Sequence, residues 1–534
     1  MIDIPEHGAA WWQAGIVYQI YPRSFMDSNG DGVGDLRGII GRLDYLEWLG
    51  IDAIWISPIY PSPMCDFGYD ISKYKGIHEL FGSLEDFDEL VSEAHARDIR
   101  VILDYVPNHT SSAHPWFLES RSSRDNPKRD WYIWHDPAPD GGPPNNWLSH
   151  FGGGAWEFDE PSGQYYFHAF LVEQPDLNWR NPEVQQAMYD VLRFWLQRGV
   201  DGFRIDVFYQ IIKDDELRDD PPNPDWVPEQ GPYNRLLHVY SMDRPEVHDI
   251  AREIRRVLES YGDGVMIGEI WLPVEQLVTY YGQECTGTHL PLNFQLIELP
   301  WNADLIRRAI RGYEDLLPRG GWPNWVLGNH DIHRVASRVG AAQARVAAMM
   351  LLLLRGTPTM YYGDEIGMRN VPIPADRICD PFEKNVPGLG LGRDPQRTPM
   401  QWSAEAQAGF TTGEPWLPID EDFAESNVEA EREHPRSLLS LYRTLIELRR
   451  AEPALSIGDY EEFECEETVL AWKRTHASGS FLVALNLDRD PAVLALGHEA
   501  GSIELTTDLK GSGTPVSEYL SLGGNQGVLV RLDT

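Results

Sequence analysis

The sequence predicts an α/β protein: a (β/α)8 TIM barrel with an inserted subdomain after the third strand and a C-terminal antiparallel β domain. Three observations predict this fold. Short, continuously apolar runs recur eight times up to residue 362, with polar or helix-like stretches between them. The connection after the third run is far longer than the others. After about residue 455 the pattern changes to alternating, strand-like runs.

The eight apolar runs are the expected barrel strands. Strands that are apolar throughout belong to parallel sheets covered on both faces, and eight strand–helix units suit a closed barrel. Two intervening helices have recognisable starts: Ser83 with Asp86 resembles a capping box opening residues 83–97, and Asn181 followed by proline opens residues 181–198. The strands are expected at residues 16–21, 53–56, 101–105, 202–206, 265–270, 292–296, 325–331 and 359–362.

The long connection is expected to form a small subdomain on the rim of the barrel. It is rich in Trp, Pro, Gly, Asn and Asp, and a long segment inside a compact barrel is usually functional. A helix over residues 435–450 would lead to the C-terminal domain, whose strand-like runs are 469–472, 481–485 and 527–530. The predicted division is a barrel from residues 1–107 and 179–455, an inserted subdomain from 108–178, and a β domain from 456–534.

Composition and charge limit the class of protein. The 534 residues are 42% hydrophobic and 24% charged, which is ordinary for globular proteins of more than one domain. A net charge of −38 argues against nucleic acid or an anionic membrane surface as partner. The four cysteines lack metal-type spacing, residues 1–12 do not resemble a signal peptide, and no apolar run approaches a membrane span in length. We expect a cytoplasmic protein, as a monomer or small homo-oligomer.

Polar clusters stand at the ends of four expected strands. Alternation places Arg204 and Asp206 side by side on one face of the fourth strand. A carboxylate held beside an arginine stays ionised well below neutral pH and suits attack on a sugar carbon. The C-terminal strand ends of a barrel are where active sites form. The other clusters, at the third, fifth and seventh strands, are Asn108-His109, Glu269 and Asn329-His330-Asp331.

In order and position these clusters resemble the four conserved regions of the α-amylase family of glycoside hydrolases (family 13). Gln174-Pro175-Asp176-Leu177-Asn178 and Tyr362-Gly363-Asp364-Glu365 resemble further marks of the family, so the resemblance covers nearly the whole chain. It implies a retaining glycosidase, which needs two carboxyl groups flanking the glycosidic bond. By resemblance Asp206 is the nucleophile, Glu269 is the general acid/base, and Asp331 is a third carboxylate that binds sugar hydroxyls and favours distortion of the ring.

The resemblance also implies roles for the surrounding side chains. Arg204 would keep Asp206 ionised and oriented, while His109 and His330 would donate hydrogen bonds to sugar hydroxyls. For any one of these residues taken alone, a structural ion pair or rim hydrogen bond is the simpler reading. Four matched clusters on four strand ends favour the active site.

Further residues are expected to close the sugar pocket. Asp66 and Tyr69, after the second strand, resemble the pair that binds the distal hydroxyls of the terminal sugar and stacks on its ring. Arg397 resembles a contact of the exo-acting branch, and we expect it to pair with Asp66 behind a single glucose. Phe167 and His168, in the insert, are expected to line the entrance. The alternative for these positions is packing or ion pairing at the barrel rim.

A loop after the first strand has the pattern of a cation site. Its oxygen side chains fall at positions 1, 3, 5 and 9, a glycine stands at 6, and a backbone carbonyl is offered at 7. This resembles an EF-hand calcium loop, except that position 12 is Gly38 rather than glutamate. The alternative is a loop held by its own Asx turns. We expect no organic cofactor and a structural Ca²⁺ or Mg²⁺ bound by Asp27, Asn29, Asp31, Val33 and Asp35.

The resemblance is closest to the α-glucosidase and oligo-1,6-glucosidase branch, because residues 17–25 and the cation-type loop match it. We therefore expect an exo-acting α-glucosidase that releases glucose from short oligosaccharides and disaccharides through a covalent glucosyl-enzyme. Val207 resembles enzymes with α-1,6 activity, whereas residues 208–214 and 220–226 resemble α-glucosidases of broader specificity. One side chain discriminates by only about 1–3 kcal/mol, so the linkage preference stays open.

Three alternatives to an α-glucosidase make different demands on the sequence. A transglycosylase, or a sucrose- or trehalose-converting enzyme, would use the same covalent intermediate, and the sequence does not exclude it. An inactive relative serving a membrane transporter would lack catalytic carboxylates and carry an anchor, but Asp206, Glu269 and Asp331 are all present and no anchor is visible. A polysaccharide-binding module would not need a matched acid and nucleophile.

Overall fold

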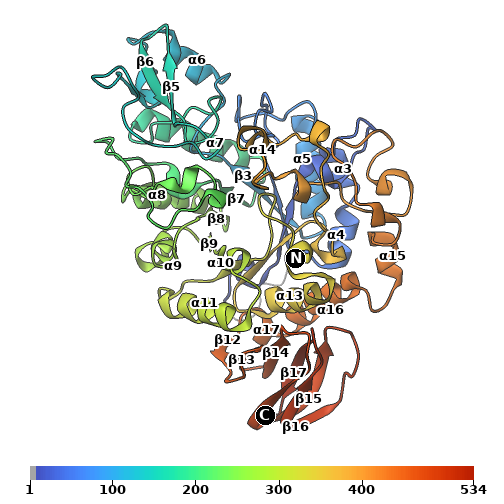
Figure 1. Cartoon of the computed structure of the whole chain (residues 1–534). Helices are drawn as coiled ribbons and strands as arrows, with labels where there is room; N and C mark the ends of the chain where they lie inside the picture. Colours follow the sequence, from blue (N-terminus) through green and yellow to red (C-terminus); the bar gives the residue numbers. More distant parts are fainter. Residues whose placement is uncertain (1–7, 534) are drawn as a thin grey trace.

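A closed barrel of eight parallel strands forms the centre of the computed structural model, which describes residues 8–533 (Figure 1). The strand order is β10-β11-β1-β2-β3-β7-β8-β9, and a parallel bridge from Asn293 to Trp325 joins the two ends. The predicted fold class is confirmed. The strands are β1 (Val17–Ile20), β2 (Ala53–Ile56), β3 (Arg100–Tyr105), β7 (Gly202–Ile205), β8 (Val265–Glu269), β9 (Leu290–Leu292), β10 (Asn324–Val326) and β11 (Thr357–Tyr361).

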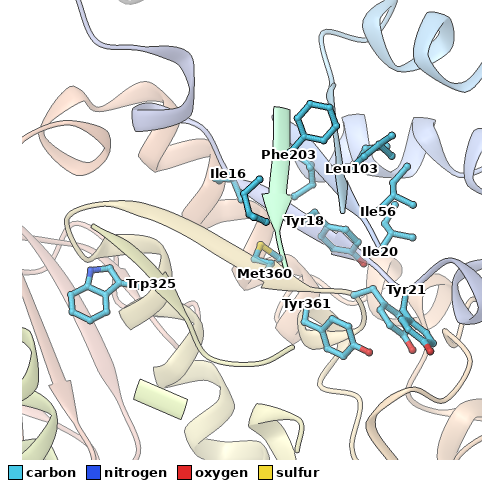
Figure 2. Close-up of a cluster of buried hydrophobic side chains, with 14 of the residues drawn as sticks. Ile16, Tyr18, Ile20, Tyr21, Ile56, Leu103, Phe203, Trp325, Met360 and Tyr361 are labelled. Atoms are coloured by element: carbon cyan, nitrogen blue, oxygen red, sulfur yellow. The ribbon is translucent and has the colours of Figure 1, made fainter. Parts of the chain in front are cut away.

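Each barrel strand carries two sets of side chains, because successive residues point to opposite faces. One set packs with the surrounding helices in the largest core cluster, in which Tyr18, Leu103 and Phe203 are buried (Figure 2). The other set, which includes Ile102 and Ile267, forms a second cluster inside the barrel. By the same alternation, the chemically active side chains at the strand ends share the inner face: Asp104, Arg204, Asp206 and Glu269.

The sixth strand differs from its predicted position. It was expected at residues 292–296, but β9 ends at Leu292 and residues Gln295–Glu298 form the short helix α10. The Asn293 side chain accepts a hydrogen bond from the Gln295 backbone N–H, an Asx turn that ends the strand and turns the chain into the helix.

The predicted helix starts are confirmed. Helix α5 (Leu84–His95) begins with a capping box in which Ser83 and Asp86 bond each other's backbone N–H groups. Helix α7 (Pro182–Leu196) begins at Asn181, whose side chain accepts from the Glu183 N–H. Among the described residues, four other helices are longer than ten residues: α8 (Val247–Glu259), α11 (Ala303–Leu316), α13 (Ala341–Leu353) and α16 (Leu438–Ala451). Helix α6 (Pro115–Ser122), in the insert, has eight residues.

The predicted insert folds as a separate lobe with a small antiparallel sheet. Its strands lie in the order β4 (Trp134–His135), β6 (Gln164–Phe167) and β5 (Trp156–Asp159). Trp147, Trp156 and Phe167 form a core of their own. Figure 1 shows this lobe at the end of the barrel opposite to the C-terminal domain. The insert therefore stands beside the strand ends that carry the polar clusters.

The C-terminal domain is a six-stranded antiparallel sheet in the order β12-β13-β14-β17-β15-β16. The three predicted runs fall in β13 (Val469–His476), β14 (Gly479–Asn486) and β17 (Gly527–Leu532). Three strands were not predicted, because polar residues interrupt them and many of their side chains are exposed. They are β12 (Asp459–Glu462), β15 (Ala492–Thr506) and β16 (Pro515–Leu522).

The C-terminal domain completes the end of a barrel helix. Helix α13 ends at Leu353, whose carbonyl accepts from Arg474 Nη1 at 2.9 Å and from Trp472 Nε1 at 3.3 Å, both on β13. The neighbouring Leu352 carbonyl accepts from Arg449 of α16 at 3.0 Å. These are carbonyls that a helix end leaves without an internal partner. Within residues 8–533, no helix is long and apolar enough to cross a membrane.

Candidate active site

One cavity of about 770 Å³ opens at the C-terminal ends of the barrel strands. Its walls come from the barrel, from the insert, and from the segments that follow β7, β8, β10 and β11. Most of the sequence-predicted sugar-binding and catalytic residues line this single cavity: Asp66, Tyr69, His109, Asp206, Glu269, His330 and Asp331. Arg204 and Arg397 are almost completely buried and contact residues of the lining.

Arg204 serves three carboxylates rather than one. Its Nη1 lies 2.7 Å from both Asp104 Oδ1 and Asp206 Oδ1, and its Nη2 lies 2.7 Å from Glu269 Oε2. Only 1% of Arg204 is exposed. The predicted pairing of Arg204 with Asp206 is present, but the positive charge is shared with two more acids.

Because Arg204 is shared, it stabilises the Asp206 carboxylate less than it would in an isolated pair. Burial, with the nearby Glu269 and Asp104, raises the pKa of Asp206 against the opposing effect of Arg204. Burial likewise raises the pKa of Asp104 to about 6. Three acids around one guanidinium bear an excess of negative charge, so the group as a whole binds protons more tightly than separate carboxylates do.

Glu269 is fixed by donors from three places. Val207 N–H and Arg204 Nη2 both lie 2.7 Å from Oε2, and Trp271 Nε1–H donates to Oε1 at 2.8 Å. Val207 holds a left-handed backbone conformation, with φ of 36° and ψ of 46°, which a β-branched residue rarely adopts. This conformation directs its N–H to the acid, as strained residues at functional sites often do.

Asp331 is held by cations on its far side. Arg397 Nη2 lies 2.8 Å and Arg393 Nη1 3.4 Å from its Oδ1. Although burial opposes the effect, His330, Arg397 and Arg393 lower the pKa of Asp331 below its usual value. Asp331 is therefore an ionised acceptor for sugar hydroxyls.

The two predicted histidines are neutral. Burial lowers the pKa of His330 to about 3 and that of His109 to about 4. Gln19 Nε2 lies 2.8 Å from His330 Nδ1 and can only donate, so the proton of His330 is on Nε2. That nitrogen lies 2.7 Å from the Tyr69 hydroxyl, and the two rings stack at 5.5 Å. Tyr69 and His330 thus form one rigid wall.

The ion-pair partner of Asp66 differs from the prediction. Asp66 was expected to pair with Arg397, but its Oδ1 lies 2.7 Å from Arg393 Nη2, which also contacts Asp380 Oδ1 at 2.7 Å. Arg397 instead contacts Asp331. Arg393 lies only four residues before Arg397, so the predicted segment does supply the partner of Asp66, but through the other of its two arginines.

The entrance also differs. Phe167 and His168 are buried and are not part of the cavity lining; Phe167 packs in the core of the insert. Two other aromatic residues of the insert, Phe151 and Phe170, line the cavity in their place. Phe151 precedes β5 and Phe170 follows β6, which ends at Phe167, so the aromatic residues that reach the cavity lie in loops of the insert rather than in its strands.

A segment after β7 forms much of the outer wall and was not predicted as part of the site. All of residues 230–238 except Arg235 line the cavity, together with residues 390–393. The Tyr233 ring stacks between the imidazoles of His150 and His238, with 3.7 Å between ring centroids on each side. This stack joins the segment to the insert. No local sequence pattern indicates it, because Tyr233 and His238 belong to the segment whereas His150 belongs to the insert.

The predicted cation loop is held by its own hydrogen bonds. Asp27 accepts from the backbone N–H groups of Asn29, Gly30 and Gly32, and Asp35 accepts from Ser28 and Gly38. Within the part of the chain that the structure describes, no group of three or more His, Cys, Asp or Glu side chains is placed to hold a metal ion. The loop has the Asx turns of the alternative interpretation, and metal binding stays a prediction from the ligand pattern.

Proteins of known family that are similar to this chain are named for the kind of activity that the carboxylates of the cavity suggest. The family model for the catalytic domain of alpha-amylase matches residues 19–458. A probable alpha-glucosidase of Rhizobium meliloti is 41% identical over 502 residues, 91% of each chain, and an oligo-1,6-glucosidase of Parageobacillus thermoglucosidasius is 39% identical over 91% of this chain and 92% of its own. Among solved structures, the alpha-glucosyl transfer enzyme XgtA has 42% identity and a TM-score of 0.93, and an isomaltulose synthase from Klebsiella has 36% and 0.91; each match covers 98% of this chain and 100% of the other.

Proposed function

Because the chain belongs to the α-amylase family of glycoside hydrolases, we propose that it is a retaining, exo-acting α-glucosidase. Its substrates are short oligosaccharides and disaccharides with an α-glucosidic bond at the non-reducing end. The observation that carries the proposal is the meeting of Asp206, Glu269 and Asp331 in one cavity that is also lined by Asp66 and Arg393, which form an ion pair.

The first chemical step forms a glucosyl-enzyme. Asp206 attacks the anomeric carbon while the bond to the leaving oxygen breaks, and that oxygen takes the proton of Glu269. In the second step Glu269 removes a proton from water, the water oxygen bonds to the anomeric carbon, and Asp206 leaves. Two inversions retain the α configuration.

An exo mode of action follows if the Asp66–Arg393 ion pair closes the inner end of the cavity. Asp66 and Arg393 are buried and paired there, so the chain of a longer glucan has no path past the terminal glucose. Asp331, ionised and facing the cavity, accepts bonds from hydroxyls of that glucose. These contacts grow stronger as the ring flattens in the transition state, which is where binding accelerates the reaction.

Transfer of glucose to a sugar acceptor is the second candidate function. It uses the same intermediate and differs only in whether water or a hydroxyl group takes the glucose. What favours it is that several similar structures are named as transfer or isomerising enzymes, including XgtA and the isomaltulose synthase. Whether water or a sugar hydroxyl takes the glucose depends on the part of the cavity that residues 230–238 and 390–393 line.

The test is a time course on maltose, isomaltose, sucrose, trehalose and soluble starch that records every product and its anomeric form. We expect α-glucose from the disaccharides and almost none from starch. Glucose released as the β anomer would contradict the retaining mechanism. New oligosaccharides or isomerised disaccharides that appear faster than glucose would assign the protein to the transfer function.

We further propose a cytoplasmic protein with Ca²⁺ or Mg²⁺ in the loop of residues 27–35. The four cysteines, all unpaired, support a reducing compartment. The spacing of oxygen side chains supports the cation.

A further inference from the structure

Trp271 connects the acid/base to an aromatic stack at the cavity wall. It lies two residues after Glu269, beyond the end of β8, and lines the cavity. Its indole packs on Phe294 with 3.8 Å between ring centroids and an interplanar angle of 4°. The same indole donates its Nε1–H to Glu269 Oε1 at 2.8 Å. The position of this N–H is therefore set by the stack.

The two oxygens of Glu269 are not equivalent. A carboxylate oxygen has two lone-pair directions. Oε2 already receives Val207 N–H and Arg204 Nη2, each at 2.7 Å. Oε1 receives Trp271 Nε1–H, and the described residues provide no second donor to it. One lone pair of Oε1 is thus left to carry a proton, on the side chain that lines the cavity.

We propose that Trp271 is a positioning residue that selects Oε1 of Glu269 as the oxygen that transfers the proton. The inference rests on the proposed function. As the bond from the anomeric carbon breaks, its electron pair stays on the leaving oxygen, which takes the proton from Oε1, while an oxygen of Asp206 bonds to the carbon. In the second step Oε1 takes a proton from the attacking water.

The other charged or ionisable groups that face Glu269 come from three elements. Arg204 and Asp206 belong to β7 and its end, Asp104 belongs to β3, and Tyr209 follows β7. None of them contacts the indole N–H, which donates to Glu269. Removing that N–H therefore leaves this charged surrounding in place.

The experiment compares Trp271→Phe with the wild type on two substrates. Phenylalanine keeps an aromatic ring over Phe294 but has no N–H. We expect kcat/KM on maltose or isomaltose to fall about 10–100-fold, the equivalent of one hydrogen bond to a charged group. The loss on p-nitrophenyl α-glucoside should be several-fold smaller, because a good leaving group needs little acid assistance.

The pH profile supplies a second measurement. The indole N–H stabilises the ionised carboxylate, so its removal lets the acid keep its proton to higher pH. We expect the basic limb of the kcat/KM profile to move to higher pH in Trp271→Phe. A residue that only forms a platform for the sugar would not move this limb.

Trp226→Phe is the matched control. Its Nε1–H donates to the Gly231 carbonyl at 2.8 Å, near the cavity but away from Glu269. We expect the ratio of the two substrates and the basic limb to stay as in the wild type. Equal losses on both substrates in Trp271→Phe, with an unmoved limb, would overturn the inference. A wild type without α-glucosidase activity would instead overturn the proposed function.

Phe294→Leu tests the same inference should Trp271→Phe not fold. This change keeps the indole N–H but removes the ring on which the indole stacks. The orientation of the N–H toward Glu269 Oε1 is then less well fixed. A loss on the disaccharide that exceeds the loss on the aryl glucoside supports Trp271 as the positioning residue. Equal losses overturn it.

Discussion

At the scale of single residues, each of two arginines in the site contacts three carboxylates. Arg204 contacts three carboxylates, and Arg393 contacts Asp66, Asp380 and Asp331. Removing one partner of a buried pair leaves an uncompensated charge, which destabilises far more than the pair itself stabilises. Conservative changes that keep the shape are therefore the informative ones here.

Asp206→Asn removes the nucleophile but keeps a carbonyl oxygen for Arg204. We expect a folded protein whose kcat falls on the order of 10⁴-fold or more, as for other single nucleophile losses. Kinetics on p-nitrophenyl α-glucoside, with circular dichroism as the folding control, would measure this. Turnover within about tenfold of the wild type would remove Asp206 from the nucleophile role.

Asp364 gives a prediction on pH and stability. Its side chain is buried after β11, and burial, against the opposing charge of Arg334, raises its pKa to about 7. The ordinary value is about 3.9, so between about pH 4 and 7 the unfolded chain gives up this proton while the folded chain keeps it. The free energy of unfolding therefore falls as pH rises through this window.

Asp364→Asn cannot ionise and lacks this dependence. We expect its Tm, relative to the wild type, to be higher at pH 8 than at pH 5, measured by calorimetry at both values. The control is Asp225→Asn, at an exposed position. Its Tm should differ from that of the wild type by the same amount at pH 5 and at pH 8. A relative Tm for Asp364→Asn that falls with pH would contradict the burial argument.

Residue-level prediction from the sequence succeeded where the strand fixes the side chain. Arg204 and Asp206 are neighbours because residues two apart share a face, and their contact of 2.7 Å follows from that geometry. It failed where loops decide the partner. Arg393 took the place predicted for Arg397 opposite Asp66, since the two arginines lie in one loop whose path no periodicity describes.

At the scale of elements, strands and capped helices were predictable and irregular segments were not. The capping box at Ser83 gave the start of α5, because two local hydrogen bonds fix it. The Asx turn at Asn293 was missed, and with it the end of β9. The wall formed by residues 230–238 depends on the stacking of its own Tyr233 and His238 with His150, which is distant in the sequence and which only the folded chain brings there.

The loop of residues 27–35 gives a prediction on metal binding. If it binds Ca²⁺ as its spacing indicates, millimolar Ca²⁺ should raise the Tm by on the order of 5 °C over protein in a chelator. Asp31→Ala should abolish this rise by removing a ligand, and it should leave the loop folded because the exposed Asp31 side chain accepts one loop hydrogen bond, from the Val33 N–H.

Asp140→Ala is the matched control for that experiment. Asp140 is also exposed and makes the same kind of turn bond, to the Gly142 N–H at 2.9 Å. The Ca²⁺-dependent rise in Tm should persist in this variant. An equal Tm for wild-type protein with Ca²⁺ and with chelator would contradict a structural cation.

At the scale of the whole molecule, the barrel and the C-terminal domain share one set of helix-end hydrogen bonds. Arg474 and Trp472 bond the last carbonyl of α13, and Arg449 bonds the one before it. Leaving such buried groups unpaired costs about 1–3 kcal/mol each. Neither part is complete without the other.

We therefore expect a single calorimetric unfolding transition for the full chain. Arg474→Gln should lower its Tm without splitting it, since the variant weakens a contact that both parts need. The exposed Arg436→Gln, which lies between the helices α15 (Val428–Glu433) and α16, serves as the control and should leave the Tm unchanged. Two separate transitions in the wild type would contradict the coupling.

These contacts also matter for anyone who recombines such enzymes. The ribbon suggests a clean junction near residue 456, but the chemical junction runs through the C-terminal turn of α13, roughly a hundred positions earlier in the chain. A chimera that takes its last domain from a relative should bring the matching 341–356 segment with it. Otherwise the chimera replaces Arg474 and Trp472, the hydrogen-bond donors, but keeps the α13 carbonyl that they bond in this chain.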